Sequence, residues 1–255
     1  MGYFMREVIA GAVREIEKWK KPTREAKRQA QRAAKLNESS EAQKKVNLEN
    51  SLRRLRWDIN ANFEPGDYWL TFTYAREYAP TDESCEQDYK KLIRKMRTLY
   101  RRAGVELKYV SICNEPERRP HIHLLVKKGV DLQEIQSLWA YGHIGIKLLD
   151  ESGQYKQLAE YIFKHSAGKE GRKKWFSSKN LVHPQPVERE MSAKNWKDEI
   201  KPPKGWAIDK TVEVETGVNP ITGAEYIRYS LIKIQQVEKR GNKNARVCAG
   251  ATTYA

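Results

Sequence analysis

Two histidines separated by one residue, His121 and His123, are the first candidates for chemistry in this chain. The surrounding residues, 121–126, predict a strand, and residues i and i+2 of a strand point to the same face. Both imidazoles are therefore expected side by side, where they could chelate a metal ion. Glu115, at the end of the preceding predicted strand, could add a carboxylate oxygen, with Glu117 as its rival. The pair by itself also fits two histidines that merely sit on a sheet face.

The second candidate is Tyr161, followed three residues later by Lys164 on a predicted helix that ends at His165. Residues i and i+3 are neighbours on one helix face, so the hydroxyl and the ammonium can converge on one small anion. Tyrosine can act as a covalent nucleophile, but a pKa of about 10 means that it needs help from a nearby cation or base. Lys164 could supply that positive charge. The alternative is an amphipathic helix with a packed tyrosine and a surface lysine.

The elements that must position these motifs follow the order strand, helix, strand, strand, helix, strand. We predict strands at 68–74, 107–113, 121–126 and 143–149, and helices at 81–100 and 131–139. Asp82 or Ser84 could cap the first helix, and Asp131 the second. The order predicts an α+β fold, a ferredoxin-like βαββαβ antiparallel sheet with helices on one face. The other face is then free to hold a site.

The flanking segments differ from this central pattern, which we assign to a domain over 62–186. Residues 1–61 are predicted to form a basic helical extension, with helices at 24–35 and 41–60. This arm could be solvated, or it could contact nucleic acid or a partner. Residues 187–255 are predicted as a C-terminal extension that carries a β-hairpin and a loose tail. Its strands are placed at 211–215 and 226–234.

Composition narrows the class of protein and of partner. The 255 residues include 48 Lys and Arg against 33 Asp and Glu, a net charge of +15, which favours a polyanion such as nucleic acid. No run approaches the roughly 20 apolar residues of a membrane span. Three scattered cysteines favour a reducing compartment. Charged residues interrupt the first 19 positions, so we expect no signal peptide and a cytoplasmic location.

Taken together, the two motifs resemble those of the HUH endonucleases, the rolling-circle replication initiators of phages, plasmids and mobile elements. The resemblance joins the His-hydrophobic-His strand to a helical Tyr-x-x-Lys about forty residues later. Asn62–Tyr74 looks like the first motif of that family, and Arg118–Leu125 looks like its metal motif. Ser177–Pro184 is similar to a segment that follows the tyrosine helix in bacterial and phage members. The resemblance covers about residues 50 to 185.

The resemblance implies an enzyme that nicks and rejoins single-stranded DNA at a replication origin. Tyr161 would attack the phosphate, leaving a 5′-phosphotyrosine on the enzyme and a free 3′-hydroxyl, with Lys164 stabilising the charge. The two histidines and Glu115 would hold Mg²⁺ or Mn²⁺. The family's carboxylate usually lies seven or eight residues before the first histidine, whereas Glu115 lies six before it. Gln157 stands four residues before the tyrosine, which indicates a single-tyrosine enzyme.

The expected partner is single-stranded DNA or an origin hairpin, held by basic and aromatic side chains. We assign this contact to Arg118, Arg119, Lys169, Arg172, Lys173, Lys174 and Trp175. No P-loop motif occurs in the chain, so a helicase would be supplied by the host. No membrane partner is expected.

Two other functions fit parts of the same pattern. A ferredoxin-like sheet with exposed aromatic residues also describes non-catalytic proteins that bind single-stranded DNA or RNA. Such a protein would keep the charge and the fold but would not need two histidines and a tyrosine at one site. A relaxase of conjugative transfer or a transposase of the HUH type would share the chemistry and differ only in its biological process.

Overall fold

The chain forms two compact units. The first joins Met1–Trp57 to the segment that begins at His183, and the second is Asp58–Val182. The computed structural model describes residues 2–25, 27–28, 32, 38–113, 119–166, 175–196 and 200–234. The second unit holds the elements of the predicted central domain, whose functional limits at 62 and 186 stay a prediction.

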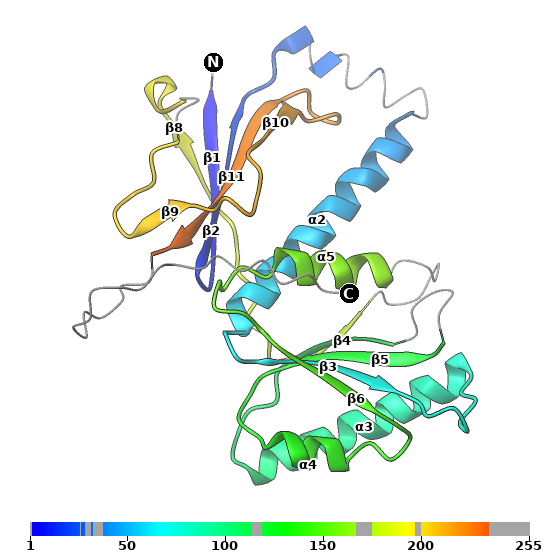
Figure 1. The fold of residues 1–255 in the computed structure, drawn as a ribbon. Helices are drawn as coiled ribbons and strands as arrows, with labels where there is room; N and C mark the ends of the chain where they lie inside the picture. The colour runs from blue at the N-terminus through cyan, green and yellow to red at the C-terminus, as the bar shows by residue number, and fades with distance from the viewer. Residues whose placement is uncertain are drawn as a thin grey trace, which may run out of the picture. The chain divides into compact units, whose positions relative to one another are not determined.

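The second unit is built on one antiparallel sheet (Figure 1). Its elements are β3 (Tyr68–Thr73), α3 (Asp82–Arg102), β4 (Tyr109–Cys113), β5 (His121–Val126), α4 (Leu132–Ser137), β6 (Ile144–Leu148), α5 (Lys156–His165) and β7 (Phe176–Ser177). The strands lie in the order β6-β3-β5-β4-β7. The first six of these elements confirm the predicted βαββαβ order, and the sheet confirms the ferredoxin-like α+β class.

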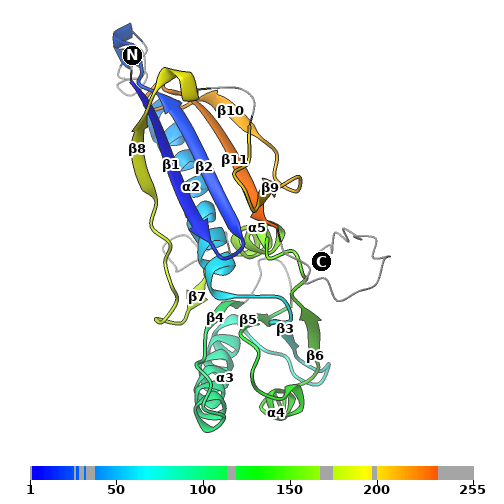
Figure 2. The same ribbon diagram turned by 90° about the vertical axis from the view of Figure 1, so that its left-hand side faces the viewer.

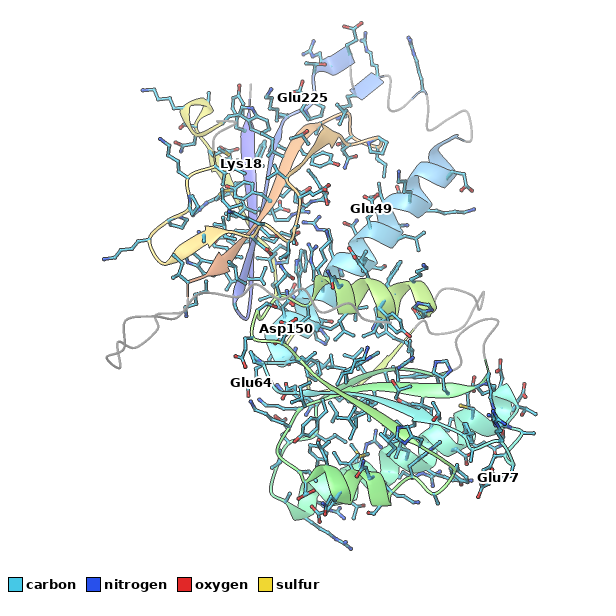
Figure 3. All side chains as sticks on the ribbon, viewed as in Figure 1. Lys18, Glu49, Glu64, Glu77, Asp150 and Glu225 are labelled. Atoms are coloured by element: carbon cyan, nitrogen blue, oxygen red, sulfur yellow. The ribbon has the colours of Figure 1, made fainter. Side chains whose placement is uncertain are left out.

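Strand alternation places the core of this unit on the face covered by α3 and α4. Leu70 and Phe72 on β3, and Ile122 and Leu124 on β5, are fully buried on that face. The apolar stripe of α3, with Met96 at its centre, packs against them. Side chains of helices and strands fill the space between the two layers (Figure 3). Burial of this many large apolar side chains supplies most of the driving force for folding the unit.

The first turn of α3 is capped by Thr81, one residue before the predicted candidates Asp82 and Ser84. The Thr81 Oγ1 accepts a hydrogen bond from the Ser84 backbone N–H, and the Ser84 Oγ accepts one from the Thr81 N–H. This reciprocal capping box satisfies two N–H groups that the helix itself leaves without acceptors. The prediction was wrong by a residue because Ser84 completes the box from the third helical position. The predicted N-cap Asp131 of α4 is confirmed.

The sheet face opposite α3 and α4 carries α5 (Figures 1 and 2). The sequence predicted that this face would be free. Leu158, Ala159 and Ile162 of α5 are fully buried, which fixes the helix to the unit along one apolar stripe. Tyr161 lies at the border of that stripe and is half-buried. The helix that carries the candidate nucleophile therefore packs directly on the histidine face.

The first unit corrects the prediction of a helical N-terminal extension. Residues 3–20 form two strands joined by a turn at Gly11, whose φ of 59° favours glycine. These strands are β1 (Tyr3–Ala10) and β2 (Val13–Lys20). Adjacent charged residues such as Arg14 and Glu15 interrupt the period-two alternation that would have indicated strands. Their other pairing partners, β8 (Val187–Met191) and β11 (Glu225–Lys233), lie more than 160 residues further along the chain, where local sequence gives no signal.

The two terminal segments, predicted as separate extensions, share one six-stranded sheet. Its further strands are β8 (Val187–Met191), β9 (Trp206–Ile208), β10 (Glu215–Val218) and β11 (Glu225–Lys233), with the short helix η1 (Ala193–Asn195) after β8. The order is β10-β11-β2-β1-β8, and β9 also pairs with β11. The predicted late hairpin exists as β10 and β11. Its first strand starts at Glu215 rather than at 211, because Thr211 closes a turn on the Asp209 carboxylate.

Helix α2 (Glu38–Asn62) confirms the helix predicted at 41–60. The helix predicted at 24–35 lies largely outside the described residues, and the tail from 241 lies wholly outside them. Among the described residues, no helix is both long and apolar enough to cross a lipid bilayer.

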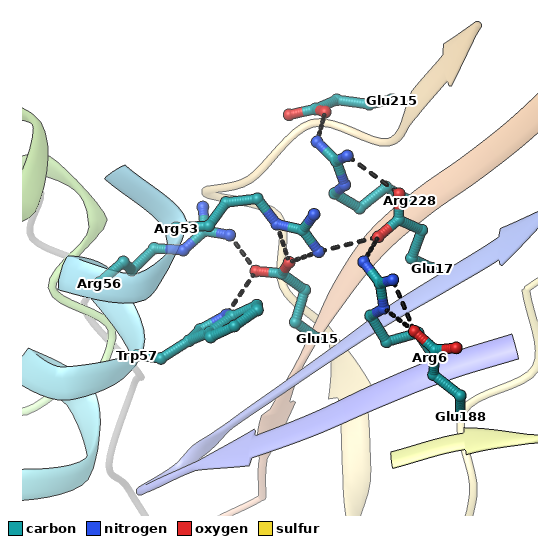
Figure 4. A network of polar contacts seen from close by, with 9 residues as sticks. All are labelled: Arg6, Glu15, Glu17, Arg53, Arg56, Trp57, Glu188, Glu215 and Arg228. Carbon is teal, nitrogen blue, oxygen red and sulfur yellow. Dashed lines mark hydrogen bonds and ion pairs between the residues drawn. The ribbon is translucent and has the colours of Figure 1, made fainter. Parts of the chain in front are cut away.

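A buried carboxylate anchors α2 to the sheet of the first unit (Figures 2 and 4). Glu15 on β2 is 3% exposed and receives ion pairs from Arg53 and Arg56 and a hydrogen bond from the Trp57 indole. Burial by itself would raise the pKa of Glu15, but the Arg56 and Arg53 guanidinium groups together hold it below its usual range. A buried carboxylate without these partners would be strongly destabilising, so the α2 arginines and Glu15 require one another.

Replacing Glu15 with Gln should destabilise the first unit by about 3–5 kcal/mol, because two buried guanidinium groups lose their anion. Urea denaturation followed by circular dichroism measures the change. A lowered carboxyl pKa stabilises the fold above its unfolded value near 4.5 and loses that effect as the pH falls through the folded value. The difference between wild type and Glu15→Gln should therefore shrink below about pH 4.5.

The matched control is Glu41→Gln, which removes an exposed carboxylate from an ion pair with Lys44. Exposed pairs contribute about 0–1 kcal/mol, so this variant should unfold close to wild type. Equal unfolding midpoints for the Glu15 and Glu41 variants would show that the buried network does not hold α2.

Candidate active site

The two histidines face each other on β5. The Nε2 atoms of His121 and His123 lie 3.1 Å apart, and their rings are nearly perpendicular, at 88°. His123 is 6% exposed, and His121 is half-buried. Ile122 between them points into the core with α3. The prediction that both imidazoles share the non-core face is met by this geometry.

Each ring has a hydrogen-bond partner at its Nδ1, on the side away from the other ring. The His121 Nδ1 lies 2.8 Å from the Arg119 carbonyl oxygen, which can only accept, so this nitrogen carries the hydrogen. A neutral His121 therefore presents a lone pair at Nε2. The His123 Nδ1 lies 2.9 Å from the Thr71 Oγ1, which can accept in the same way. With the Thr71 hydroxyl as the acceptor, the His123 Nε2 presents its lone pair toward the His121 Nε2.

Helix α5 brings Tyr161 to this point. Its hydroxyl lies 3.0 Å from the His123 Nε2, and the two rings are perpendicular, at 89°. Trp69 stacks flat on His123, with ring centroids 5.0 Å apart and planes 5° apart, and meets Tyr161 edge-on. The two motifs, 38 residues apart in sequence, are thus joined by one hydrogen bond, and both contact the Trp69 ring.

Three residues of this site were not assigned by the sequence. Thr71 and Trp69 belong to β3, where Thr71 pairs in register with His123. His165 follows Tyr161 by one helical turn, and its ring centroid lies 4.3 Å from that of the tyrosine. Period-two alternation does place Trp69 and Thr71 on one face of a strand. Only the pairing of β3 with β5 shows that this is the histidine face.

The predicted accessory residues fall into two groups. Glu115, Glu117, Arg118, Lys169, Arg172, Lys173 and Lys174 lie outside the described residues. Arg119 and Lys164 are described and exposed, and Trp175 is half-buried. The Arg119 guanidinium donates to the carbonyls of Ala75 and Tyr78, so it holds the loop after β3. Trp175 packs near Phe163, with ring centroids 6.1 Å apart.

The histidine pair fits a metal ion by its donor chemistry. Two nitrogens bound to one ion at about 2.1 Å and roughly at right angles would lie about 3 Å apart, close to the 3.1 Å between the Nε2 atoms. The Nδ1 atoms of His121 and His123 make hydrogen bonds to Arg119 and Thr71. Metal-ligating histidines are oriented by such bonds at the nitrogen that does not bind the metal. Among the described residues, no cluster of three or more His, Cys, Asp and Glu could hold an ion. The predicted carboxylate ligands, Glu115 and Glu117, lie outside the described residues.

The fold and the site describe a ferredoxin-like protein with a histidine pair and a helical tyrosine meeting on one sheet face. Residues 67–166 match the family of replication-associated protein ORF2/G2P. The matched segment contains the six βαββαβ elements, both histidines and Tyr161, and it leaves the first unit outside. This similarity supports a replication-associated protein of the Rep type. Neither the curated proteins nor the solved structures include a match to the chain.

Proposed function

We propose that the chain is a replication initiator that nicks and rejoins single-stranded DNA at an origin through a covalent bond to Tyr161. The observation that carries the proposal is the 3.0 Å contact between the Tyr161 hydroxyl and the His123 Nε2. That contact places a potential nucleophile beside a pair of nitrogens suited to a divalent cation. The similarity of residues 67–166 to replication-associated proteins gives the reaction its biological setting.

The chemistry is a transesterification at one phosphodiester. The Tyr161 oxygen forms a bond to phosphorus, the bond from phosphorus to the 3′ oxygen breaks, and overall the phenolic proton ends on that 3′ oxygen. The products are a 5′-phosphotyrosine and a 3′-hydroxyl that can prime synthesis. One phosphodiester is exchanged for another, so rejoining requires no nucleotide triphosphate. Rejoining is the reverse reaction, in which a 3′-hydroxyl attacks the phosphotyrosine and the Tyr161 hydroxyl is released.

The residues around Tyr161 restrict its motion. Trp69 contacts both the tyrosine and His123, and the His165 ring lies against the other side of the phenol. A nucleophile held in this way loses little further entropy on attack. Lys164, exposed one turn away, would reach the phosphate from the solvent side.

We assign Mg²⁺ or Mn²⁺ to His121 and His123, with Glu115 as the proposed third ligand. A divalent cation bound there would supply positive charge to the non-bridging phosphate oxygens. The chain's own part is to orient the imidazoles, which it does through the Arg119 carbonyl and the Thr71 hydroxyl. Relaxases and transposases use the same chemistry, so mapping the cleaved sequence on a candidate origin distinguishes initiation from transfer.

Replacing Tyr161 with Phe should abolish covalent capture of DNA, because only the attacking oxygen is lost. The measurement uses a 5′- and a 3′-labelled single strand that carries a candidate origin, incubated with Mn²⁺ and resolved on a denaturing gel. Wild type should give a protein–DNA adduct on the 3′-side fragment and a free 3′-hydroxyl on the other.

The matched control is Tyr155→Phe, which removes a hydroxyl from a buried tyrosine just before the same helix. This variant should still form the adduct. An adduct that persists in Tyr161→Phe, or cleavage that leaves no adduct in wild type, would rule out Tyr161 as the nucleophile. DNA binding without any cleavage would favour the non-catalytic alternative.

Replacing Thr71 with Val should weaken Mn²⁺ binding by about 10- to 100-fold, because His123 loses the partner that orients its Nδ1. Isothermal titration of the protein with Mn²⁺ measures the affinity without requiring DNA cleavage. Thr71→Ser keeps the hydroxyl and should restore the affinity. If the Val and Ser variants bind Mn²⁺ equally tightly, Thr71 does not position the metal site.

A further inference from the structure

The positive charge of the chain is concentrated in the first unit. Residues 1–57 together with 183–255 hold 27 Lys and Arg against 16 Asp and Glu, an excess of 11. Residues 58–182 hold 21 against 17, an excess of only 4. The two excesses account for the net charge of +15. A polyanion is therefore attracted chiefly to the unit that lies outside the replication-associated match.

Within the first unit, the densest basic stretch follows β2 directly. Residues 21–32 include five Lys and Arg and a single acidic residue, Glu25. Lys21 directly follows the last residue of β2, and its backbone N–H donates to the Gly2 carbonyl, so this stretch starts at the end of the strand that carries Trp19. Lys20 lies over the Trp196 ring on the opposite face and is not part of the stretch.

An aromatic row crosses the sheet at the same end. Phe4 on β1 and Tyr226 on β11 are both register partners of Trp19 on β2, so the three side chains share one face. Phe4 and Trp19 lie nearly parallel, with planes 16° apart and ring centroids 5.6 Å apart. All three residues are half-buried. Gly217 pairs with Tyr226 on the outer strand, and the tyrosine ring lies against this glycine.

A second row, two residues further along each strand, supports the aromatic one (Figure 4). Arg6 and Arg228 flank Glu17, and each places its guanidinium near an aromatic ring of the first row. Arg6 lies 5.4 Å from the Trp19 centroid, and Arg228 lies 5.2 Å from that of Tyr226. The ion pairs neutralise these arginines. This row therefore restricts the aromatic rings, and the attraction for anions comes from residues 21–32.

The anchor of α2 lies beside the aromatic row but does not include it. Arg53 of the helix pairs with Glu15 and Glu17, and Glu17 precedes Trp19 by two residues, roughly 7 Å along the strand. Residues 43–45 and 47–50 of α2 are exposed, so this part of the helix does not cover the sheet face tightly. Among the described residues, the three aromatic side chains therefore stay half-buried at this end of the sheet.

We propose that this end of the first unit's sheet binds single-stranded DNA, with bases stacked on Phe4, Trp19 and Tyr226. The phosphates would be neutralised by the basic stretch that follows β2. Aromatic stacking beside a positively charged path is how proteins hold single strands without reading sequence. The choice of DNA over RNA rests on the proposed nicking function, whereas the stacking surface itself does not.

The test uses the full chain and a fluorescein-labelled 20-nucleotide oligothymidylate, with binding followed by fluorescence anisotropy. Trp19→Leu should weaken binding about tenfold or more, because base stacking on one aromatic ring is lost. Trp19→Phe keeps a stacking ring and should restore most of the affinity. Tyr226→Leu gives a second, independent variant at the edge of the row, should Trp19→Leu lower the yield of folded protein.

The matched control is Trp196→Leu, on the opposite face of the same sheet, where Trp196 packs on Tyr3 and on the cluster around Ile16. This variant should bind the oligonucleotide as wild type does, once circular dichroism shows that it is folded. Equal affinities for wild type and folded Trp19→Leu and Tyr226→Leu variants would overturn the proposal. So would equal losses in Trp19→Leu and Trp196→Leu.

Experiments can distinguish failure of this binding proposal from failure of the proposed nicking function. Oligothymidylate binding is measured without cleavage, so the effect of Trp19→Leu is tested whether or not Tyr161, in the other unit, forms an adduct. Polyglutamate that competes as well as DNA, with the same sensitivity to Trp19→Leu, would overturn the assignment to nucleic acid. Affinity that falls steeply with salt while the ratio between wild type and Trp19→Leu persists would support it, because only the phosphate contribution is screened.

Discussion

The register between β3 and β5 is the constraint on which the candidate site depends. Period-two alternation sends Ile122 and Leu124 into the core and leaves His123 between them on the other face. A slip of one residue would bury the imidazole among apolar side chains and expose the two aliphatic ones. The hydrophobic core is therefore what holds His123 beside Thr71. The site inherits its geometry from packing that takes no part in the chemistry.

The second requirement is a helix on the face that the βαββαβ layout leaves open. The apolar stripe of α5 fixes the helix, and Tyr161 at the border of the stripe points its hydroxyl to His123. The aromatic contact with Trp69 joins strand, helix and histidine into one rigid group. Such prearrangement is what a nucleophile needs if little entropy is to be lost on attack.

The first unit must bring together strands from both ends of the described chain. Alternating charges on Arg6, Glu17 and Arg228 match across the sheet, and Glu15 ties α2 to its face (Figure 4). Buried ion pairs of this kind tolerate few alternative arrangements, because an unpaired partner is costly. The network thus specifies how distant segments assemble, and the aromatic row lies beside it on the same strands.

The sequence alone determined the second unit's element order and the sharing of one face by His121 and His123. These features follow from short-range periodicity, which two or four neighbouring residues reveal. It did not determine the β-hairpin at 3–20, the contribution of Thr71 and Trp69, or the position of α5. Each of these depends on contacts between residues far apart in the chain, such as β2 with β11 and β3 with β5. Only the tertiary structure decides which faces meet, because burial of one face depends on its distant partner.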